Sequence, residues 1–425
     1  MHFPVSSVTE AAVLLPLLSC QVFSLVPSTI TNTAGRRGIM PAAQMSTSTS
    51  SSPLTPPVIS LLPETPAAAK RPKKNHIGPS NMPALDIHPT VGEYPVDYTM
   101  HAENRAKLIA RLREADGVVP TGVLLFQGGM SANRDETDHE PVFRQESTFQ
   151  YLFGVREPDC SATIDLATGK ATLFIPRLPA EYSTWMGNIL PPKHFQEVYK
   201  VDEVLFVDEL ASNVKAGAPG KIYLNKGYNT DGKAWSKPAS VEGLEGVEAD
   251  SSTTLYDAVV ECRVIKTKKE IDIMQHITNL SSEAHFEVMR RTRPGMREFQ
   301  LESMFRHWVY FNGGCRHTAY TSICGCGPNS AVLHYGHAGA PNDRTIGEND
   351  MLLLDMGGEY HCYASDITCS FPASGKFTAD QRMIFEAVRD MAFAVMDAMK
   401  PGGCGRRCTN SRTESPASAS KPRAS

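Results

Sequence analysis

The feature that most constrains this chain is a stretch in which two apolar, strand-like runs each carry an aspartate at one end. In NDMLLLDMGGEYHCYASDITCSFP (residues 349–372), Asp355 closes the first run and Asp366 precedes the second, with a glycine-containing turn between them. Strands joined in this way pair side by side, so both carboxylates can reach one spot. Carboxylate oxygens suit Mn²⁺, Mg²⁺, Co²⁺ or Zn²⁺, and paired ions polarise water for hydrolysis. The stretch predicts a hydrolytic metal site, although aspartates at strand ends also serve as turn or capping groups.

Two histidines lie just before this stretch, in the Gly- and Pro-containing segment AVLHYGHAGAPNDRT (residues 331–345). His334 and His337 could contact a carboxylate or an oxyanion, or act as ordinary structural hydrogen-bond donors. Other catalytic signatures are missing from the sequence: it has no G-x-S-x-G elbow and no G-x-x-x-x-G-K-[ST] loop, and its C-x-C pair at 324 and 326 has no recognisable partner pattern. The aspartates and these histidines are therefore the candidates for chemistry.

The part of the chain before these candidates is typical of an α/β domain. HAENRAKLIARLREADG (101–117) places apolar residues on one helical face and ends at a glycine. GVLLFQGG (122–129) has the composition of a buried strand, and TIDLATGKATLFIP (163–176) predicts a hairpin that turns at Thr168-Gly169. A helix, strands and a hairpin in this order indicate an α/β domain over about 97–250.

Three helices are expected after a linker near residues 250–265. The first ends at Pro294-Gly295, the second stops at Asn312-Gly313-Gly314, and the third opens with the capping box TADQ (378–381). Their apolar residues recur at helical spacing, so we expect each stripe to be buried. The stripes are Ile273, Ile277, Leu280, Ala284 and Val288; Leu301, Phe305 and Trp308; and Ile384, Val388, Met391, Val395 and Met399.

Length, charge and cysteine usage exclude several classes of protein. A chain of 425 residues with 41% hydrophobic residues is too long for one small module and has an ordinary globular composition. Residues 83–400 carry 31 basic and 43 acidic side chains, a net charge of −12, whereas nucleic-acid binding needs a basic excess. The ten cysteines lack zinc-ribbon or C-x-x-C spacing, so free thiols in a cytoplasmic protein are expected rather than a secreted disulfide framework.

Both ends of the chain differ in composition from the rest. Residues 1–95 contain a Ser/Thr tract and one apolar run, residues 11–26, which Pro16 interrupts and which is too short for a membrane span. We expect a disordered extension here, with an organellar targeting segment as the alternative. Residues 403–425 lack periodicity and are rich in Ser, Arg and Pro, so a disordered tail is expected there.

Five segments are informative together: FRQESTFQYLFGVREPDC (143–160), PRLPAEYSTWMG (176–187), VECRVIKTKKEI (260–271) and the segments 317–346 and 352–381. Through them the chain from about 97 to 402 resembles the Xaa-Pro dipeptidase (prolidase) family of pita-bread metallopeptidases. The resemblance implies a creatinase/aminopeptidase-P-like α/β domain over 96–250, followed by a pita-bread catalytic domain. It also implies a homodimer, a two-metal centre that normally holds Mn²⁺, and cleavage of dipeptides with C-terminal proline or hydroxyproline.

The same resemblance implies roles for four residues. Asp355 and Asp366 match the family's first two metal ligands, and Asp366 would bridge the two ions. His334 matches a catalytic histidine that contacts the substrate, and Tyr320 matches an active-site tyrosine that binds substrate. Zn²⁺, Co²⁺ or Mg²⁺ are the substitutes expected for Mn²⁺.

The resemblance stops after Lys400-Pro401-Gly402, where family members continue into the second half of the pita bread. That half supplies a His and two Glu ligands, a second catalytic His and a substrate-binding Arg. The resemblance therefore implies only the first half of the catalytic domain over 251–402, an inactive chain, and a final helix whose apolar stripe has no partner. The alternatives are a non-catalytic subunit that pairs with a full-length enzyme and a metal-free peptide-binding relative. No nucleic-acid or membrane partner is expected.

Overall fold

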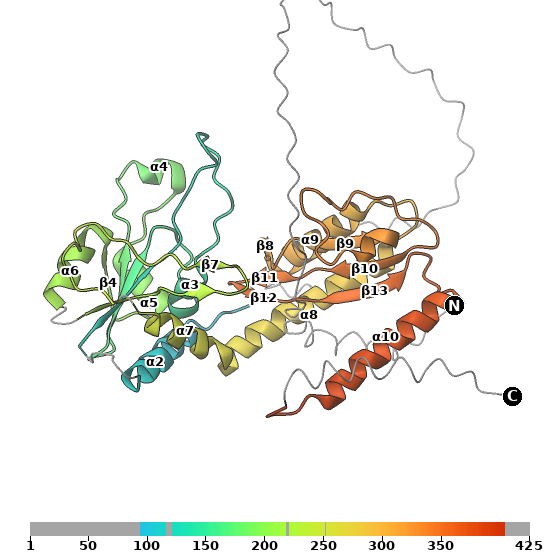
Figure 1. Cartoon of the computed structure of the whole chain (residues 1–425). Coiled ribbons are helices and arrows are strands. Elements are labelled where there is room, and N and C mark those ends of the chain that lie inside the picture. The colour runs from blue at the N-terminus through green and yellow to red at the C-terminus, as the bar shows by residue number, and fades with distance from the viewer. Residues whose placement is uncertain (1–93, 116–120, 218–220, 251, 404–425) are drawn as a thin grey trace, which may run out of the picture. The chain divides into compact units, whose positions relative to one another are not determined.

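The structure, a computed structural model, describes residues 94–115, 121–217, 221–250 and 252–403 (Figure 1). The expected extension over 1–95 and tail over 403–425 lie outside the described residues, apart from residues 94, 95 and 403. No helix in the described part is long and apolar enough to cross a membrane. Along the chain, a five-stranded sheet is followed by two three-stranded sheets and their helices.

The five-stranded sheet has the order β4-β3-β2-β1-β5 and contains both parallel and antiparallel pairs. Its inner neighbours β1, β2 and β3 are antiparallel, while β4 and β5 join the edges in parallel. The hairpin between β2 and β3 turns at Gly169, whose φ of 80° is readily adopted by glycine. The predicted strand and hairpin are thus confirmed. The strands are β1 (Val123–Gln127), β2 (Ser161–Asp165), β3 (Ala171–Ile175), β4 (Glu203–Phe206) and β5 (Ile222–Leu224).

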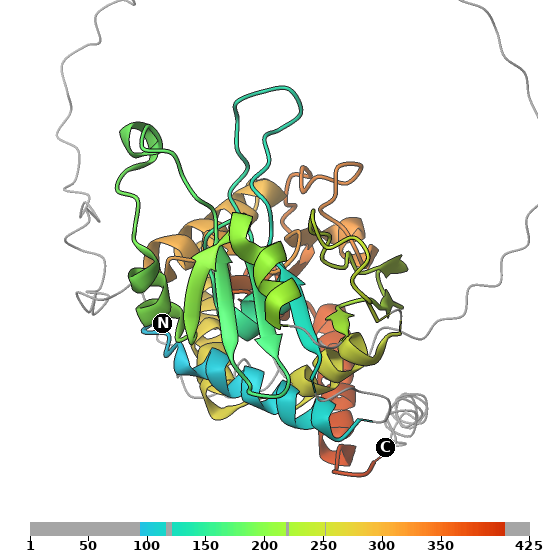
Figure 2. The ribbon, with the colours of Figure 1, turned by 90° about the vertical axis from the view of Figure 1, so that its left-hand side faces the viewer.

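Both faces of this sheet are covered. Side chains alternate between the two faces along β1, and each set packs in its own core. Leu124 and Phe126 belong to one core, which includes residues of α2, α3 and α7. Leu125 points the other way and packs with residues of α6, the helix in front of the sheet in Figure 2. The helices of this part are α2 (Thr99–Arg113), α3 (Ser147–Phe153), α4 (Tyr182–Met186), α5 (Pro192–Tyr199), α6 (Leu210–Gly217) and α7 (Thr254–Val264).

The linker predicted near residues 250–265 is wrong, because α7 occupies most of that segment. Leu255, Val259 and Cys262 of α7 are buried in the core that α2 shares. These three residues recur at helical spacing, so the sequence did contain a helical pattern, but one that spans too few residues to stand out. Lys107 of α2 donates to the carbonyl of Cys262 at 2.6 Å and ties the two helices together.

Two long helices and two small sheets follow α7. The helices α8 (Lys268–Arg291) and α9 (Glu298–Gly313) confirm the first two predicted helices, and their apolar stripes pack in one core with the strands. One sheet has the order β13-β10-β9 and the other β12-β11-β8. Their strands are β8 (His317–Thr318), β9 (Ile323–Cys326), β10 (Met351–Asp355), β11 (Gly358–Tyr360), β12 (Tyr363–Ala364) and β13 (Thr368–Pro372).

The predicted pairing of the two aspartate-bearing strands is confirmed, but the predicted turn between them is wrong. β10 and β13 are antiparallel, with Asp355 opposite Thr368. The connection contains the further hairpin β11–β12, which turns at His361 and Cys362 with φ of 49° and 61°. Two successive residues with positive φ suit a two-residue hairpin, where Asn-Gly is the usual signal. His-Cys lacks that signal, so the hairpin was not expected.

The last helix, α10 (Ala379–Ala398), begins at the predicted capping box. Gln381 N donates to Thr378 Oγ1 at 3.2 Å, and Thr378 N donates to Gln381 Oε1 at 2.9 Å. The burial predicted for its apolar stripe is wrong: Ile384 is 61% and Val388 54% exposed, and only Val395 of the helix is buried. The stripe is thus exposed, as expected for a helix face without a partner.

Candidate functional site

Asp355 and Asp366 come together because β10 and β13 are neighbouring strands. Asp355 ends β10, and Asp366 lies two residues before β13. The N–H of Met356 donates to the carbonyl of Ile367 at 3.1 Å, which continues the pairing beside the two aspartates. The Tyr320 hydroxyl contacts both carboxylates and lies 3.0 Å from Oδ1 of Asp366. Three of the four residues singled out by the family resemblance therefore meet at one point.

The electrostatics of this cluster favour a bound cation. Burial, together with the nearby charge of Asp366, raises the pKa of Asp355 above its usual value. Burial and the charge of Asp355 raise the pKa of Tyr320, so its hydroxyl stays protonated. A hydroxyl has one proton and cannot donate to two carboxylates at once. A divalent cation would offset the charge, and two carboxylates offer the oxygen ligands that Mn²⁺ and Mg²⁺ prefer.

The described residues supply only part of a coordination shell. Within the described ranges, no three His, Cys, Asp or Glu side chains are grouped so as to hold a metal ion. A hard divalent ion takes about six ligands. The two aspartates therefore fit such an ion as a partial site, and its other ligands would be water, substrate or groups beyond the described residues.

Helix α8 anchors the backbone on both sides of this cluster through Ser281 and His285, one turn apart. Ser281 Oγ lies 2.7 Å from Oγ of Ser365, the residue before Asp366, and accepts from the N–H of Gly358 at 3.1 Å. His285 Nε2 donates to the carbonyl of Met356, the residue after Asp355, at 3.0 Å. These bonds hold the two aspartate-bearing segments at a set separation.

Sequence reasoning missed both of these α8 residues. Each is buried in the helix beside the apolar stripe, Ser281 after Leu280 and His285 after Ala284. A polar side chain in such a position needs a hydrogen-bond partner, which is the signal that could have identified them. Burial lowers the pKa of His285 to about 4, so its ring is neutral at pH 7.

The predicted histidines lie in the loop that follows η3 (Gly327–Ala331). His334 is exposed there, and no hydrogen bond or ion pair joins it to either aspartate among the described residues. His337 is also exposed, and its Nδ1 accepts from the N–H of Gly339 at 3.1 Å. The geometry thus gives His337 a local structural contact, and the role of His334 stays a prediction.

Comparisons with known proteins agree with this arrangement. Residues 272–412 match the model of metallopeptidase family M24, and residues 101–223 match that of the aminopeptidase P N-terminal domain. The chain thus has one region similar to metallopeptidase family M24 and one similar to the aminopeptidase P N-terminal domain. This confirms the predicted fold class, an aminopeptidase-P-like α/β domain followed by a pita-bread domain.

The relatives that this chain resembles include mammalian dipeptidases. Human Xaa-Pro dipeptidase is 52% identical over 307 residues, which make up 72% of this chain and 62% of the human protein. The mouse Xaa-Pro dipeptidase is 49% identical over the same shares. The chain thus spans about three fifths of the length of these relatives.

Two solved aminopeptidases share the fold. Aminopeptidase PepP of Pseudomonas aeruginosa is 26% identical with a TM-score of 0.59, over 72% of this chain and 68% of that structure. E. coli aminopeptidase P with the inhibitor Pro-Leu is 26% identical with a TM-score of 0.59, over 71% of this chain and 68% of that structure.

Proposed function

We propose that this protein serves the hydrolysis of dipeptides that end in proline or hydroxyproline. The observation that carries the proposal is the convergence of Asp355 and Asp366 on the Tyr320 hydroxyl. Two oxygen ligands on neighbouring strands are suited to a divalent ion and to hydrolysis. The 52% identity to a protein named Xaa-Pro dipeptidase supports this class of substrate.

Asp355 and Asp366 are the residues that would hold the divalent metal, for which Mn²⁺ is proposed. When bound, such ions supply Lewis acidity that activates water and polarises the carbonyl of the scissile bond. Zn²⁺, Co²⁺ or Mg²⁺ are proposed substitutes because each accepts carboxylate oxygen ligands. Binding of Mn²⁺ to the chain and to its Asp366→Asn variant tests the assignment.

The remaining residues would orient the reactants. The raised pKa of Tyr320 keeps its hydroxyl protonated, so that it can donate a hydrogen bond at the reaction centre. His334 is proposed to contact the substrate from its exposed loop. An X-Pro bond has no N–H, so a site for it cannot rely on a hydrogen bond donated by the scissile amide.

We further propose that this chain by itself lacks Xaa-Pro hydrolysis. The described residues place no third His, Cys, Asp or Glu beside the aspartate pair to form a metal-binding group. A centre that is short of ligands binds metal weakly. Gly-Pro hydrolysis by the 425-residue chain with added Mn²⁺ tests this, with human Xaa-Pro dipeptidase as the active control. A soluble, monodisperse preparation that hydrolyses Gly-Pro would overturn it.

Self-association is proposed through the segment that contains α4. Trp185 is 83% exposed, and Met186, Ile189 and Leu190 are exposed beside it in sequence. A group of large exposed apolar side chains marks a contact surface. It would serve a homodimer or, in the non-catalytic alternative, a pair with a full-length enzyme. Light scattering of the chain and its Trp185→Ser variant tests this, and a monomeric parent would contradict it.

A cytoplasmic location is proposed from the cysteines. Those that the structure describes are free thiols, which is the usual state in a reducing compartment. They are Cys160, Cys262, Cys315, Cys324, Cys326, Cys362 and Cys369. Cell fractionation tests the location, and recovery in an organelle would support the targeting alternative.

A further inference from the structure

A buried glutamate at the start of α9 has no part in the mechanism above. Glu298 is the first residue of the helix and is 0% exposed. Within the described part of the chain, no Lys, Arg or His forms an ion pair with it. The N-terminus of a helix favours negative charge, and hydrogen-bond donors can satisfy a buried carboxylate. The carboxylate of Glu298 is therefore held by neutral donors and by its place on the helix.

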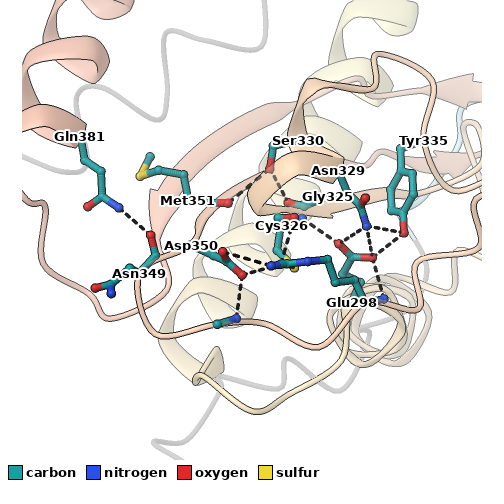
Figure 3. A network of polar contacts seen from close by, with 12 residues as sticks. Glu298, Gly325, Cys326, Asn329, Ser330, Tyr335, Asn349, Asp350, Met351 and Gln381 are labelled. Carbon is teal, nitrogen blue, oxygen red and sulfur yellow. Dashed lines mark hydrogen bonds and ion pairs between the residues drawn. The ribbon is translucent and has the colours of Figure 1, made fainter.

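Those donors all come from the last residue of β9 and from the chain between β9 and β10 (Figure 3). Glu298 Oε1 accepts from the N–H of Cys326 at 2.8 Å and from Asn329 Nδ2 at 3.1 Å. Its Oε2 accepts from the Tyr335 hydroxyl at 2.6 Å and from the N–H of Arg344 at 3.1 Å. One carboxylate thus joins the end of β9, η3 and both sides of the loop that holds His334.

The contact with Tyr335 matters most for His334, its neighbour in sequence. Tyr335 is 5% exposed, and its hydroxyl also accepts from Asn329 Nδ2 at 2.8 Å. His334 itself is exposed. The backbone of His334 is therefore fixed on one side by Tyr335, a buried tyrosine whose hydroxyl makes two hydrogen bonds. The His334 side chain itself is exposed.

The far end of the loop is held by the next turn of α9. Asn342 is 1% exposed and donates from Nδ2 to Glu302 Oε2 at 3.0 Å and to the carbonyl of Ser322 at 2.9 Å. Its Oδ1 accepts from the N–H of Cys324 at 3.1 Å. The φ of Asn342 is 57°, a left-handed value that asparagine tolerates better than most residues. Glu298 and Glu302, four residues apart, thus hold both ends of the loop.

We propose that Glu298 is a positioning residue that sets the place of His334 through Tyr335. The carboxylate orders residues 326–344 as one unit, with β9 at one end and Arg344 at the other. The proposal rests on the proposed function in one respect only, namely that the ligand contacted by His334 is a dipeptide substrate. The placement of the loop follows from the contacts themselves.

Three variants of the 425-residue chain test the proposal. Glu298→Gln keeps the shape of the side chain but replaces one accepting oxygen with an NH₂ group, which faces donors and cannot accept from them. Tyr335→Phe removes one hydroxyl and keeps the ring. Glu270→Gln is the matched control: Glu270 is 2% exposed, lies at the start of α8, and accepts from the N–H of Thr267 at 2.7 Å and the Tyr363 hydroxyl at 3.0 Å.

Hydrogen exchange and histidine NMR are the two measurements. We expect Glu298→Gln to speed exchange in residues 326–344 at least about tenfold and to shift the His334 ring signal. Tyr335→Phe should do the same to a smaller extent, and Glu270→Gln should change neither quantity. An unchanged His334 signal in both Glu298→Gln and Tyr335→Phe would overturn the proposal. So would an equal rise in exchange over the whole chain in Tyr335→Phe, since that indicates general loss of stability.

A titration with Gly-Pro and Mg²⁺, the proposed substitute for Mn²⁺ that does not broaden NMR signals, separates this proposal from the proposed function. If the His334 signal responds to Glu298→Gln but not to Gly-Pro with Mg²⁺, the positioning role stands and the substrate role of His334 fails. If it responds to Gly-Pro but not to Glu298→Gln or Tyr335→Phe, the substrate role stands and the positioning role fails.

Discussion

His285 Nε2 lies 3.0 Å from the carbonyl oxygen of Met356, the residue that follows Asp355. The donor is a fully buried imidazole on α8, and its ring lies edge-on to Phe305 at a centroid distance of 5.2 Å. A neutral ring is needed to keep this environment, because none of the acidic side chains that the structure describes pairs with His285, and an unpaired buried charge is costly. The support of the candidate metal site therefore depends on pH.

We predict that stability falls as the pH is lowered from about 6.5 to about 4. The pKa of His285 is lowered to about 4 by burial, so the unfolded chain binds a proton in this range before the folded one does. Above the unfolded pKa both states are neutral and the effect vanishes. The loss between pH 7 and pH 5 should be about 2 kcal/mol for this one residue.

Urea unfolding at pH 7 and pH 5 checks this prediction. His285→Gln is the informative variant, because its longer side chain reaches about as far as Nε2 of histidine, so its amide can still donate to the Met356 carbonyl but does not titrate. It should be less stable than the parent at pH 7 and lose about 2 kcal/mol less between the two pH values. An equal loss in parent and variant would assign the acid sensitivity elsewhere, for instance to His101, whose pKa burial also lowers to about 4.

Asp366→Asn should weaken Mn²⁺ binding by about tenfold or more. The change removes one charge that offsets the ions, and an amide is a poorer ligand than a carboxylate. Equilibrium dialysis with metal analysis measures the effect. Asp380→Asn, on the exposed first turn of α10, is the control and should bind Mn²⁺ as the parent does. Equal binding by the Asp366 variant and the parent would remove Asp366 from the site.

Tyr320 should stay protonated in the metal-free folded protein up to a pH of about 10, the value at which an ordinary tyrosine ionises. Burial and the charges of Asp355 and Asp366 raise its pKa, so the folded state keeps the proton that the unfolded state loses near pH 10. Folding stability should therefore fall as the pH rises above about 10. Ultraviolet titration of the parent and Tyr320→Phe should give the same phenolate signal up to that limit. A phenolate signal that the variant loses would contradict the assigned environment.

Polar substitutions on the exposed stripe of α10 should improve solubility at little cost in stability. Ile384→Ser and Val388→Ser remove side chains that are 61% and 54% exposed, so unfolding free energy should change by less than about 0.5 kcal/mol each. Val395→Ser is the matched control, since Val395 is 7% exposed and its loss should cost about 1–3 kcal/mol. Sedimentation and urea unfolding distinguish the two cases. Equal destabilisation by all three would show that the stripe is covered.

The elements with a strong local signal were predictable from the sequence. Thr378 and Gln381 form the reciprocal cap that their spacing predicts, and the 3.6-residue period placed α8 and α9. The positions of Asp355 and Asp366 were predictable for the same reason, since each lies at one end of a strand-like apolar run. These signals lie within a few residues of one another, so they need no knowledge of the rest of the chain.

Other features were decided by contacts between distant segments. Ser281 meets Ser365 across 84 positions, and the Tyr320 hydroxyl meets Asp366 across 46. Nothing local in the sequence specifies those pairs. The first arises only when α8 packs on the strands, and the second only when the segment after β8 lies beside the segment that leads into β13. The same holds for Glu298. By its sequence it is an ordinary acidic residue in a first helical turn, and it is buried only because β9 and the loop after it cover its carboxylate. The sequence by itself determined which residues are candidates for the chemistry and placed Asp355 and Asp366 at the ends of two strands. The tertiary structure alone decided which partners hold them, because burial makes each polar group find a donor or acceptor wherever the chain brings one.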